Sequence, residues 1–265
     1  MREKLIVKNN LVEAYHSALC ALYEEGEEAD CSDWGQRQKE LSITIQVLEP
    51  LSEPLISKLF IGGPRELEQY RQEMLDGILD FEVDRGNWAY TYHDRMVNYY
   101  IDNTIQSPNH YSLNQLEFIV EDLLRNPSSR RAVVDIRDNS VDAYSDDPAC
   151  LQHIQYFIRN DELHCKVLFR SNDACKASFM NMFALIMLQK RIADELDVKV
   201  GSYTHRANSF HCYEKDYNLL EGYYNRICDG KDLFSDYEGD WKEMMEEYQE
   251  DIKNSVKILK NRGTK

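Results

Sequence analysis

Apolar residues recur along the chain with two different spacings, one typical of helices and one typical of strands. The helical spacing is found mainly toward the two ends of the chain. Apolar residues that recur every three or four positions, the spacing of a helix with one buried face, occur in residues 9–26, 63–79, 112–127, 216–227 and 240–261. Residues 96–106 fit the same pattern and are predicted as a further helix. Ser112 is expected to cap the helix that stops before Pro127.

The middle of the chain carries the pattern of β-strands instead. Residues 41–48 alternate between apolar and polar side chains and run into Pro50, which predicts a strand. Three short runs, 131–137, 153–159 and 163–170, are rich in β-branched and apolar residues. The turn-like sequence Asn160-Asp161-Glu162 is expected to join the last two as a hairpin.

A long apolar stretch at residues 179–196 predicts a central buried helix, and the acidic stretch at 229–240 is expected to be an exposed loop. Helices that precede and follow the strands, without strict alternation, favour an α+β fold. We therefore expect a single domain over residues 1–265.

Charge and cysteine content narrow the range of partners. A formal net charge of −16 disfavours a nucleic-acid polymer or an anionic membrane surface, because both attract a cationic protein face. The 7 cysteines are scattered without a C-x-x-C pair, which is typical of reduced thiols in the cytoplasm. The first residues contain no apolar signal region, and no run approaches the roughly 18 apolar residues of a membrane span. A cytoplasmic location without a membrane partner is the expectation.

The stretch "LFRSNDACKASFMN" at residues 168–181 suggests a site. Arg170 offers a forked cation for a phosphate, and cationic surroundings would activate a thiol such as Cys150, which precedes a predicted strand. Asn181 carries the donor and the acceptor that match the N3–H and C4=O edge of uracil. His211 and Tyr213, at alternate positions, would face the same side of an extended segment and suit sugar hydroxyls.

Each of these residues has a simpler interpretation when it is taken alone. A cysteine such as Cys150 is more often a packed apolar residue than a nucleophile, and an arginine such as Arg170 is more often part of a surface ion pair. His211 beside Cys212 has no second pair of ligands at usable spacing, so no metal is predicted.

Together, however, Cys150, the sequence "RSND", Asn181 and the sequence "HCY" resemble the thymidylate synthase and pyrimidine-nucleotide hydroxymethylase family in order and spacing. "NPSSRR" at residues 126–131 resembles the paired arginines of that family, and the similarity extends from about Tyr90 to Tyr213. The resemblance implies a large mixed sheet flanked by helices and a homodimer packed through that sheet. Residues 1–85 and 214–265 are expected to be divergent segments of the same domain.

The resemblance also implies a role for each matching residue. Cys150 would attack C6 of the pyrimidine, which makes C5 a carbon nucleophile, and Tyr90 would assist removal of the C5 proton. Arg170 and Ser171 would bind the 5′-phosphate, together with Arg130 and Arg131 of the other subunit. Asp173 would contact the nucleotide and the pterin ring of folate. Asn181 would bind the base, and His211 and Tyr213 would bind the 3′-hydroxyl.

Upstream of Tyr90 the match is thinner. The family relays protons through a glutamate, for which Glu53 is the candidate, although Glu53 also fits a solvent-facing carboxylate before Pro54. Arg37 is a further candidate for the phosphate. The chain departs from the family at Leu151, where a histidine is usual, and at Phe169, where a glutamine is usual.

Two further departures concern the folate. The sequence "KAS" replaces the glycine–x–proline before Phe179, and the tail "VKILKNRGTK" lacks the small apolar end that closes over folate. Trp88 stands beside Tyr90, out of register with the family's folate-stacking tryptophan.

The function that the resemblance implies is methyl transfer to dUMP with 5,10-methylenetetrahydrofolate as co-substrate and without a metal, which yields dTMP and dihydrofolate. Asn181 supports uracil, because the cytosine enzymes of the family carry aspartate there. The atypical tail and the displaced tryptophan leave open a dUMP or dCMP hydroxymethylase, in which water replaces the hydride. A catalytically idle nucleotide-binding homologue is the alternative of another class.

Overall fold

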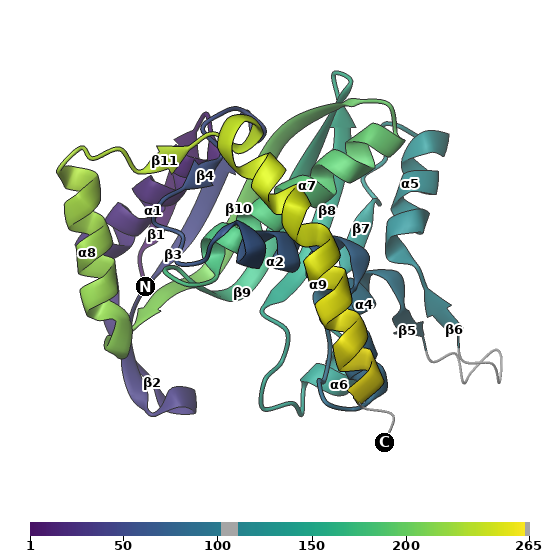
Figure 1. The fold of residues 1–265 in the computed structure, drawn as a ribbon, viewed down its shortest axis with the longest axis horizontal. Helices are drawn as coiled ribbons and strands as arrows, with labels where there is room; N and C mark the ends of the chain where they lie inside the picture. The colour runs from purple at the N-terminus through teal and green to yellow at the C-terminus, as the bar shows by residue number, and fades with distance from the viewer. Residues whose placement is uncertain (102–110, 263–265) are drawn as a thin grey trace.

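The computed structural model describes residues 1–101 and 111–262, and a mixed seven-stranded sheet forms its centre (Figure 1). The strand order is β1-β3-β10-β9-β8-β7, and β2 pairs with β3 at one end of it. β1 lies parallel to β3 and β9 parallel to β10, whereas the other pairs are antiparallel. The strands are β1 Glu3–Lys8, β2 Glu27–Cys31, β3 Gln36–Val47, β7 Val133–Asp135, β8 Leu151–Arg159, β9 Glu162–Asp173 and β10 Lys199–Tyr213.

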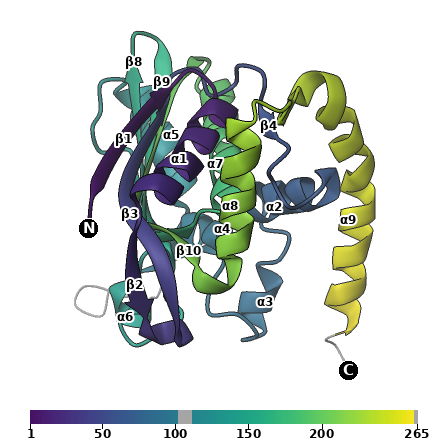
Figure 2. The ribbon, with the colours of Figure 1, turned by 90° about the vertical axis from the view of Figure 1, so that its left-hand side faces the viewer.

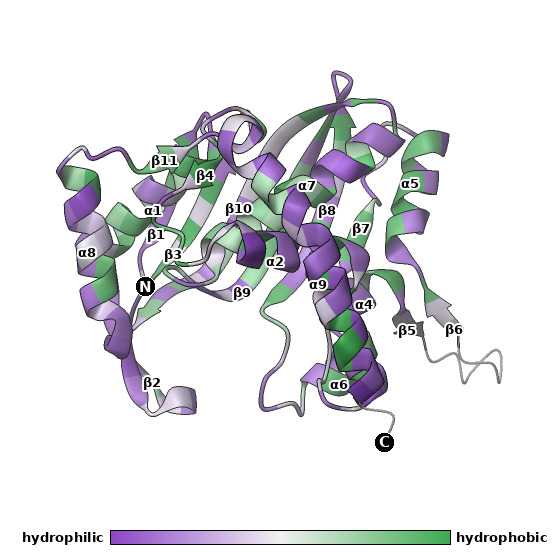
Figure 3. Cartoon of the chain, in the orientation of Figure 1, coloured by the Kyte–Doolittle hydropathy of each residue, from purple (hydrophilic) through white to green (hydrophobic). Residues whose placement is uncertain are grey.

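The long helices stack on one side of this sheet (Figure 2). The side of α7 that faces the sheet and the side that faces α2 are both apolar, so α7 is the buried centre of the domain, as its sequence predicts. Outside it, α9 is largely polar along its length (Figure 3) and buries Met245 and Ile252. These helices are α1 Leu11–Glu25, α2 Pro64–Asp76, α7 Ser178–Glu195, α8 Tyr217–Cys228 and α9 Lys242–Arg262.

Shorter elements complete the domain around the edges of the sheet. Two small antiparallel pairs, β4 with β11 and β5 with β6, lie outside the main sheet. None of the described helices is both long and apolar enough to cross a membrane. The shorter elements are β4 Ile56–Ser57, α3 Phe81–Asp84, α4 Tyr92–Val97, β5 Tyr99–Ile101, β6 Tyr111–Leu113, α5 Gln115–Arg125, α6 Asn139–Asp142 and β11 Phe234–Ser235.

The α+β fold and the strand-rich middle are confirmed. The predicted hairpin turn has Asn160 and Asp161 at positive φ, the backbone conformation that a tight hairpin with right-handed twist requires. The expected separation of helical ends from a central sheet is wrong, however. β1 and β3 come from the first fifth of the chain and form one side of the main sheet, because β3 pairs with β10.

Three local predictions are also wrong. The helix expected over 96–106 is not formed, because α4 ends at Val97 and residues 99–101 pair with β6. Residues 102–110 of that prediction lie outside the described part. Asn114 rather than Ser112 caps α5, since its side chain accepts a hydrogen bond from the N–H of Glu117. The supposed loop at 229–240 buries Leu233 and pairs through β11 with β4, so it is not simply exposed.

Candidate active site

The register of the sheet brings the predicted residues together at one end of β8, β9 and β10. In the parallel β9–β10 pair, Ser171 lies beside Ser209 and Asp173 beside His211. On the other side of β9, the backbone N–H of Arg170 donates to the carbonyl oxygen of Cys150 at 2.8 Å. Residues that are distant in sequence therefore converge because neighbouring strands pair.

Cys150 is half-buried immediately before β8, and Arg170 braces the loop that carries it. The guanidinium of Arg170 donates to the carbonyl oxygens of Ala149 (Nε, 3.1 Å) and Pro148 (Nη2, 2.6 Å) and to the hydroxyl of Ser171 (Nη1, 3.3 Å). The same hydroxyl lies 3.5 Å from the sulfur of Cys150. Because a guanidinium has five N–H donors, two remain beyond these three described bonds, one on each Nη.

The turn after β9 positions Asn181. Asp173 accepts hydrogen bonds through Oδ1 from the N–H groups of Cys175 and Lys176, both at 3.0 Å, and these bonds hold the turn that leads into α7. Asn181 then lies in the first turn of α7 with only 4% of its surface exposed. The hydroxyl of Tyr70 donates to its Oδ1.

His211 presents a buried acceptor without a partner. Its Nδ1 donates to the carbonyl oxygen of Ser209 at 3.2 Å, while its Nε2 is buried and has no hydrogen-bond partner among the described residues. Burial lowers the pKa of His211, which favours the neutral ring. Tyr213 meets this ring edge to face at 4.8 Å, and desolvation raises the pKa of Tyr213 to about 12. An unsatisfied buried acceptor beside a phenol suits a ligand hydroxyl.

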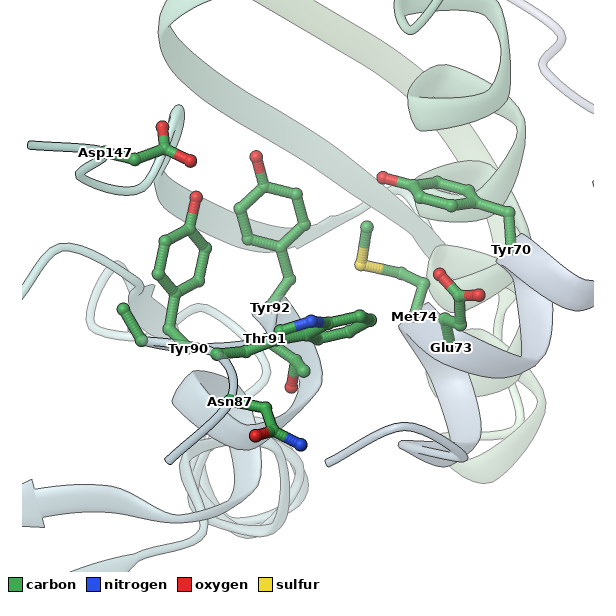
Figure 4. Close-up of a pocket in the computed structure, with 10 residues that line it drawn as sticks. Tyr70, Glu73, Met74, Asn87, Tyr90, Thr91, Tyr92 and Asp147 are labelled. Atoms are coloured by element: carbon green, nitrogen blue, oxygen red, sulfur yellow. The ribbon is translucent and has the colours of Figure 1, made fainter. Parts of the chain in front are cut away.

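A cavity of about 520 Å³ (Figure 4) lies near the cysteine, which is not itself one of the lining residues. Tyr92 connects the two, because its hydroxyl accepts from the N–H of Leu151 at 3.3 Å, directly after Cys150. Burial, followed by the nearby Cys150 and Asp147, raises the pKa of Tyr90 to about 12. The lining comes from α2, from the segment that leads into α4 together with the first residue of α4, and from one loop residue. These residues are Tyr70, Glu73, Met74, Asn87, Trp88, Ala89, Tyr90, Thr91, Tyr92 and Asp147.

The sequence prediction missed part of this lining. Trp88 lines the cavity together with Tyr90, although its register in the sequence suggested otherwise. Tyr70, Glu73 and Tyr92 were not proposed. The sequence shows only that Tyr70 and Glu73 lie three residues apart on one face of a predicted helix and that Tyr92 alternates with Tyr90, which does not indicate that these faces line a cavity.

Two other predicted residues, Glu53 and Arg37, do not line this cavity. Glu53 is exposed, and its carboxylate accepts from the backbone N–H groups of Leu55 at 2.7 Å and of Tyr237 and Glu238 at 3.0 Å. Arg37 is on the β2–β3 hairpin, 2.7 Å from Glu28.

Arg130 and Arg131 precede β7, the last strand in the sheet order. Both are exposed, and the side chain of Arg131, 3.4 Å from Asp122, remains 77% accessible. Their role toward the phosphate needs a second subunit and stays a prediction.

Within residues 1–101 and 111–262, no three His, Cys, Asp or Glu side chains are grouped closely enough to hold a metal ion. The half-buried thiol, the braced arginine and the cavity lined with aromatic residues are groups suited to covalent chemistry on an anionic ligand.

Comparison with known proteins connects this site to one family. The family model described as Thymidylate synthase matches residues 65–234. A protein of Methanocaldococcus jannaschii named "Putative thymidylate synthase" is 32% identical over 229 residues, covering 83% of this chain and 95% of that protein. The thymidylate synthase of Bacillus subtilis subsp. natto is 29% identical over 117 residues, 44% of this chain and 42% of its own length.

Solved structures show the same fold. The thermostable thymidylate synthase A from Bacillus subtilis superposes with a TM-score of 0.65, covering 86% of this chain and 87% of that one, at 14% sequence identity. At that identity the likeness concerns the fold alone.

Proposed function

Because this chain belongs to the thymidylate synthase family, whose members are methyltransferase-type enzymes, we propose that it transfers a one-carbon unit from 5,10-methylenetetrahydrofolate to C5 of dUMP and releases dTMP and dihydrofolate. The observation that carries the proposal is the group formed by Cys150, Ser171 and Arg170. Their 3.5 Å and 3.3 Å contacts join a thiol, a hydroxyl and a cation in one arrangement. A thiol placed in this way is a candidate nucleophile for addition to an electron-poor ring carbon.

The nucleotide would lie across the ends of β9 and β10. Arg170 retains two N–H donors for the 5′-phosphate, and Ser171 is adjacent. The amide of Asn181 would pair with the uracil edge, and the unpartnered Nε2 of His211 would accept from the 3′-hydroxyl beside Tyr213. The sulfur of Cys150 would add to C6, which leaves C5 as a nucleophile.

The folate would occupy the cavity next to Cys150. Its volume of about 520 Å³ falls within the range of small-molecule sites. Trp88 and Tyr90 provide aromatic faces for a pterin, and Asp173 would contact the nucleotide through its backbone and the pterin through its carboxylate. Tyr90 would assist removal of the C5 proton.

Product analysis tests this function. Incubation of the protein with dUMP and 5,10-methylenetetrahydrofolate is expected to yield dTMP and dihydrofolate in equal amounts. Hydroxymethyl-dUMP with tetrahydrofolate would instead identify a hydroxymethylase, in which water adds to the exocyclic methylene. Binding of dUMP without any product would favour the nucleotide-binding homologue.

We also propose a homodimer packed through the sheet, with Arg130 and Arg131 reaching the phosphate of the partner subunit. On β1, Leu5 and Val7 are 65% and 45% exposed while Ile6 between them is buried, so two apolar side chains lie on the sheet face opposite the helices. A partner sheet would cover them.

Mixing two inactive variants tests the shared site. Arg130→Ala/Arg131→Ala and Cys150→Ala should each be inactive alone, but a heterodimer contains one site with an intact thiol and intact arginines. Random reassortment of subunits is expected to restore about a quarter of wild-type activity, because half of the dimers are mixed and half of their sites are intact. Activity is measured as dTMP formed after the subunits are denatured together and refolded.

An unmixed refolded sample of each variant is the control. Recovery near zero, with refolded dimers shown by light scattering, would contradict the assignment of the two arginines to the partner's site.

A further inference from the structure

Tyr70 reaches across the cavity from α2 and contacts the residue proposed to bind the base. Its ring extends from the helix into the cavity (Figure 4), and its hydroxyl donates to Oδ1 of Asn181. The two residues lie 111 positions apart and meet because α2 packs against α7, whose first turn carries Asn181. A hydrogen bond from one wall of the cavity therefore ends on the amide that would face the nucleotide.

This hydrogen bond makes the two ends of the Asn181 amide different. Oδ1 accepts from Tyr70, so one of the two lone pairs of the oxygen is occupied. Nδ2 makes no hydrogen bond with the described residues, and it is not one of their fully buried atoms without a partner, so it keeps some contact with open space. The amide thus offers a ligand two N–H donors and the remaining lone pair of its oxygen.

Tyr70 can hold the amide in this orientation because its hydroxyl is a donor with a single acceptor. Burial raises the pKa of Tyr70 well above its usual value, so the phenol stays protonated near neutral pH. Oδ1 of Asn181 is the one acceptor of this proton among the described residues. If the amide turned over, Nδ2 would donate to the phenol oxygen, but the phenol proton would lose its acceptor.

The orientation of the amide matters because uracil and cytosine present opposite patterns at the edge that Asn181 would face. Uracil offers a donor at N3–H and an acceptor at C4=O, whereas cytosine offers an acceptor at N3 and an amino donor at C4. An amide can match either base, but its oxygen must face N3–H of uracil and the amino group of cytosine. An asparagine that is free to turn over therefore discriminates poorly between the two bases.

We propose that Tyr70 makes this site select uracil over cytosine by fixing the orientation of the Asn181 amide. The proposal rests on the function proposed above, in which dUMP is the nucleotide. Oδ1 accepts from Tyr70 with one lone pair and from N3–H of uracil with the other, while Nδ2 donates to C4=O. Cytosine needs the reversed amide, which leaves the buried phenol proton without an acceptor. Tyr70 touches no reacting atom, so it is a positioning residue.

Tyr70→Phe tests this role, because it removes one oxygen, keeps the ring and frees the amide to turn over. Calorimetric titration with dUMP and with dCMP, in the absence of folate, measures the selectivity as the ratio of the Kd for dCMP to the Kd for dUMP. That ratio is expected to fall by about tenfold to a hundredfold, which is the cost of one buried donor without an acceptor expressed as a ratio of binding constants. Most of the change should come from tighter binding of dCMP.

Tyr92→Phe is the matched control, because it removes another hydroxyl of the same cavity, one that bonds to the N–H of Leu151 and not to Asn181. Its ratio of Kd values should equal that of the wild type. As a second control, 2′-deoxyribose 5-phosphate lacks a base, so the wild type and Tyr70→Phe should bind it equally. Thermal melting shows whether each variant is folded.

An unchanged ratio in folded Tyr70→Phe would overturn the proposal, and a lower melting temperature alongside it would give the hydrogen bond a structural role alone. An equal fall in Tyr92→Phe would also contradict it, because the selectivity would not depend on the contact with Asn181. The wild type provides a test by itself, since dCMP binding as tight as or tighter than dUMP binding is incompatible with a fixed amide. A wild-type protein that binds neither nucleotide would refute the proposed function itself, so the two failures are distinguishable.

Discussion

Cys150→Ser is expected to lower turnover of dUMP by about 10⁴-fold or more, the size of effect that follows loss of a catalytic nucleophile. A serine hydroxyl is a much weaker nucleophile than a thiol, so a serine beside the hydroxyl of Ser171 and the cation of Arg170 could not replace Cys150. The variant should also fail to form a covalent adduct with 5-fluoro-dUMP and 5,10-methylenetetrahydrofolate, as measured by mass spectrometry of the denatured protein.

Cys228→Ser is the control, because Cys228 is an exposed thiol at the end of α8. It should retain both the adduct and the activity of the wild type. An adduct on Cys150→Ser, or turnover close to normal, would show that another residue attacks the base.

Arg170→Ala should lower kcat/KM for dUMP by about 10³-fold. Two charge-assisted hydrogen bonds to a phosphate, at about 2 kcal/mol each, amount to about 4 kcal/mol, and each 1.4 kcal/mol is a factor of ten. The substitution also removes the hydrogen bonds that Arg170 donates to the carbonyl oxygens of Pro148 and Ala149, and these bonds hold the loop before Cys150. Arg170→Lys should recover only part of the loss, since an ammonium group cannot reproduce the fork.

Steady-state kinetics and calorimetric binding of dUMP measure this effect, and thermal melting shows whether the variant remains folded. Arg159→Ala is the matched control, because Arg159 is an exposed arginine at the hairpin end of β8, and it should bind dUMP as the wild type does. Unchanged dUMP affinity in folded Arg170→Ala would rule out the phosphate role.

The strands of the main sheet differ in how well the sequence predicts them. Strands β8 and β9 were predicted because they are apolar and joined by a local turn, and local signals are present in the sequence itself. β1 was not predicted, and β10 was anticipated only at its C-terminal end. β1 is a six-residue segment with one buried residue, Ile6, and it becomes a strand because it pairs with β3 in the folded chain.

The residues of the candidate site likewise include some that the sequence could identify and some that it could not. Cys150, Arg170, Ser171 and Asn181 could be named because they occur in a recognisable order along about thirty residues. Tyr70 and Glu73 could not, because their relation to Asn181 and to the cavity arises only when α2 packs against α7. For Glu53 the sequence suggested a role that the structure does not support with contacts to the cavity. Its carboxylate accepts hydrogen bonds from the backbone N–H groups of Tyr237 and Glu238, which are far away in the sequence.

The sequence by itself thus determined the α+β class, the central helix, the family resemblance and the set of groups that would handle a nucleotide, because periodicity and motif order are properties of neighbours along the chain. Only the tertiary structure decided which strands meet, that Arg170 braces the loop of Cys150, and that Glu73 rather than Glu53 faces the cavity. Those contacts join residues from distant parts of the chain, and their geometry is set by the packing of the whole domain.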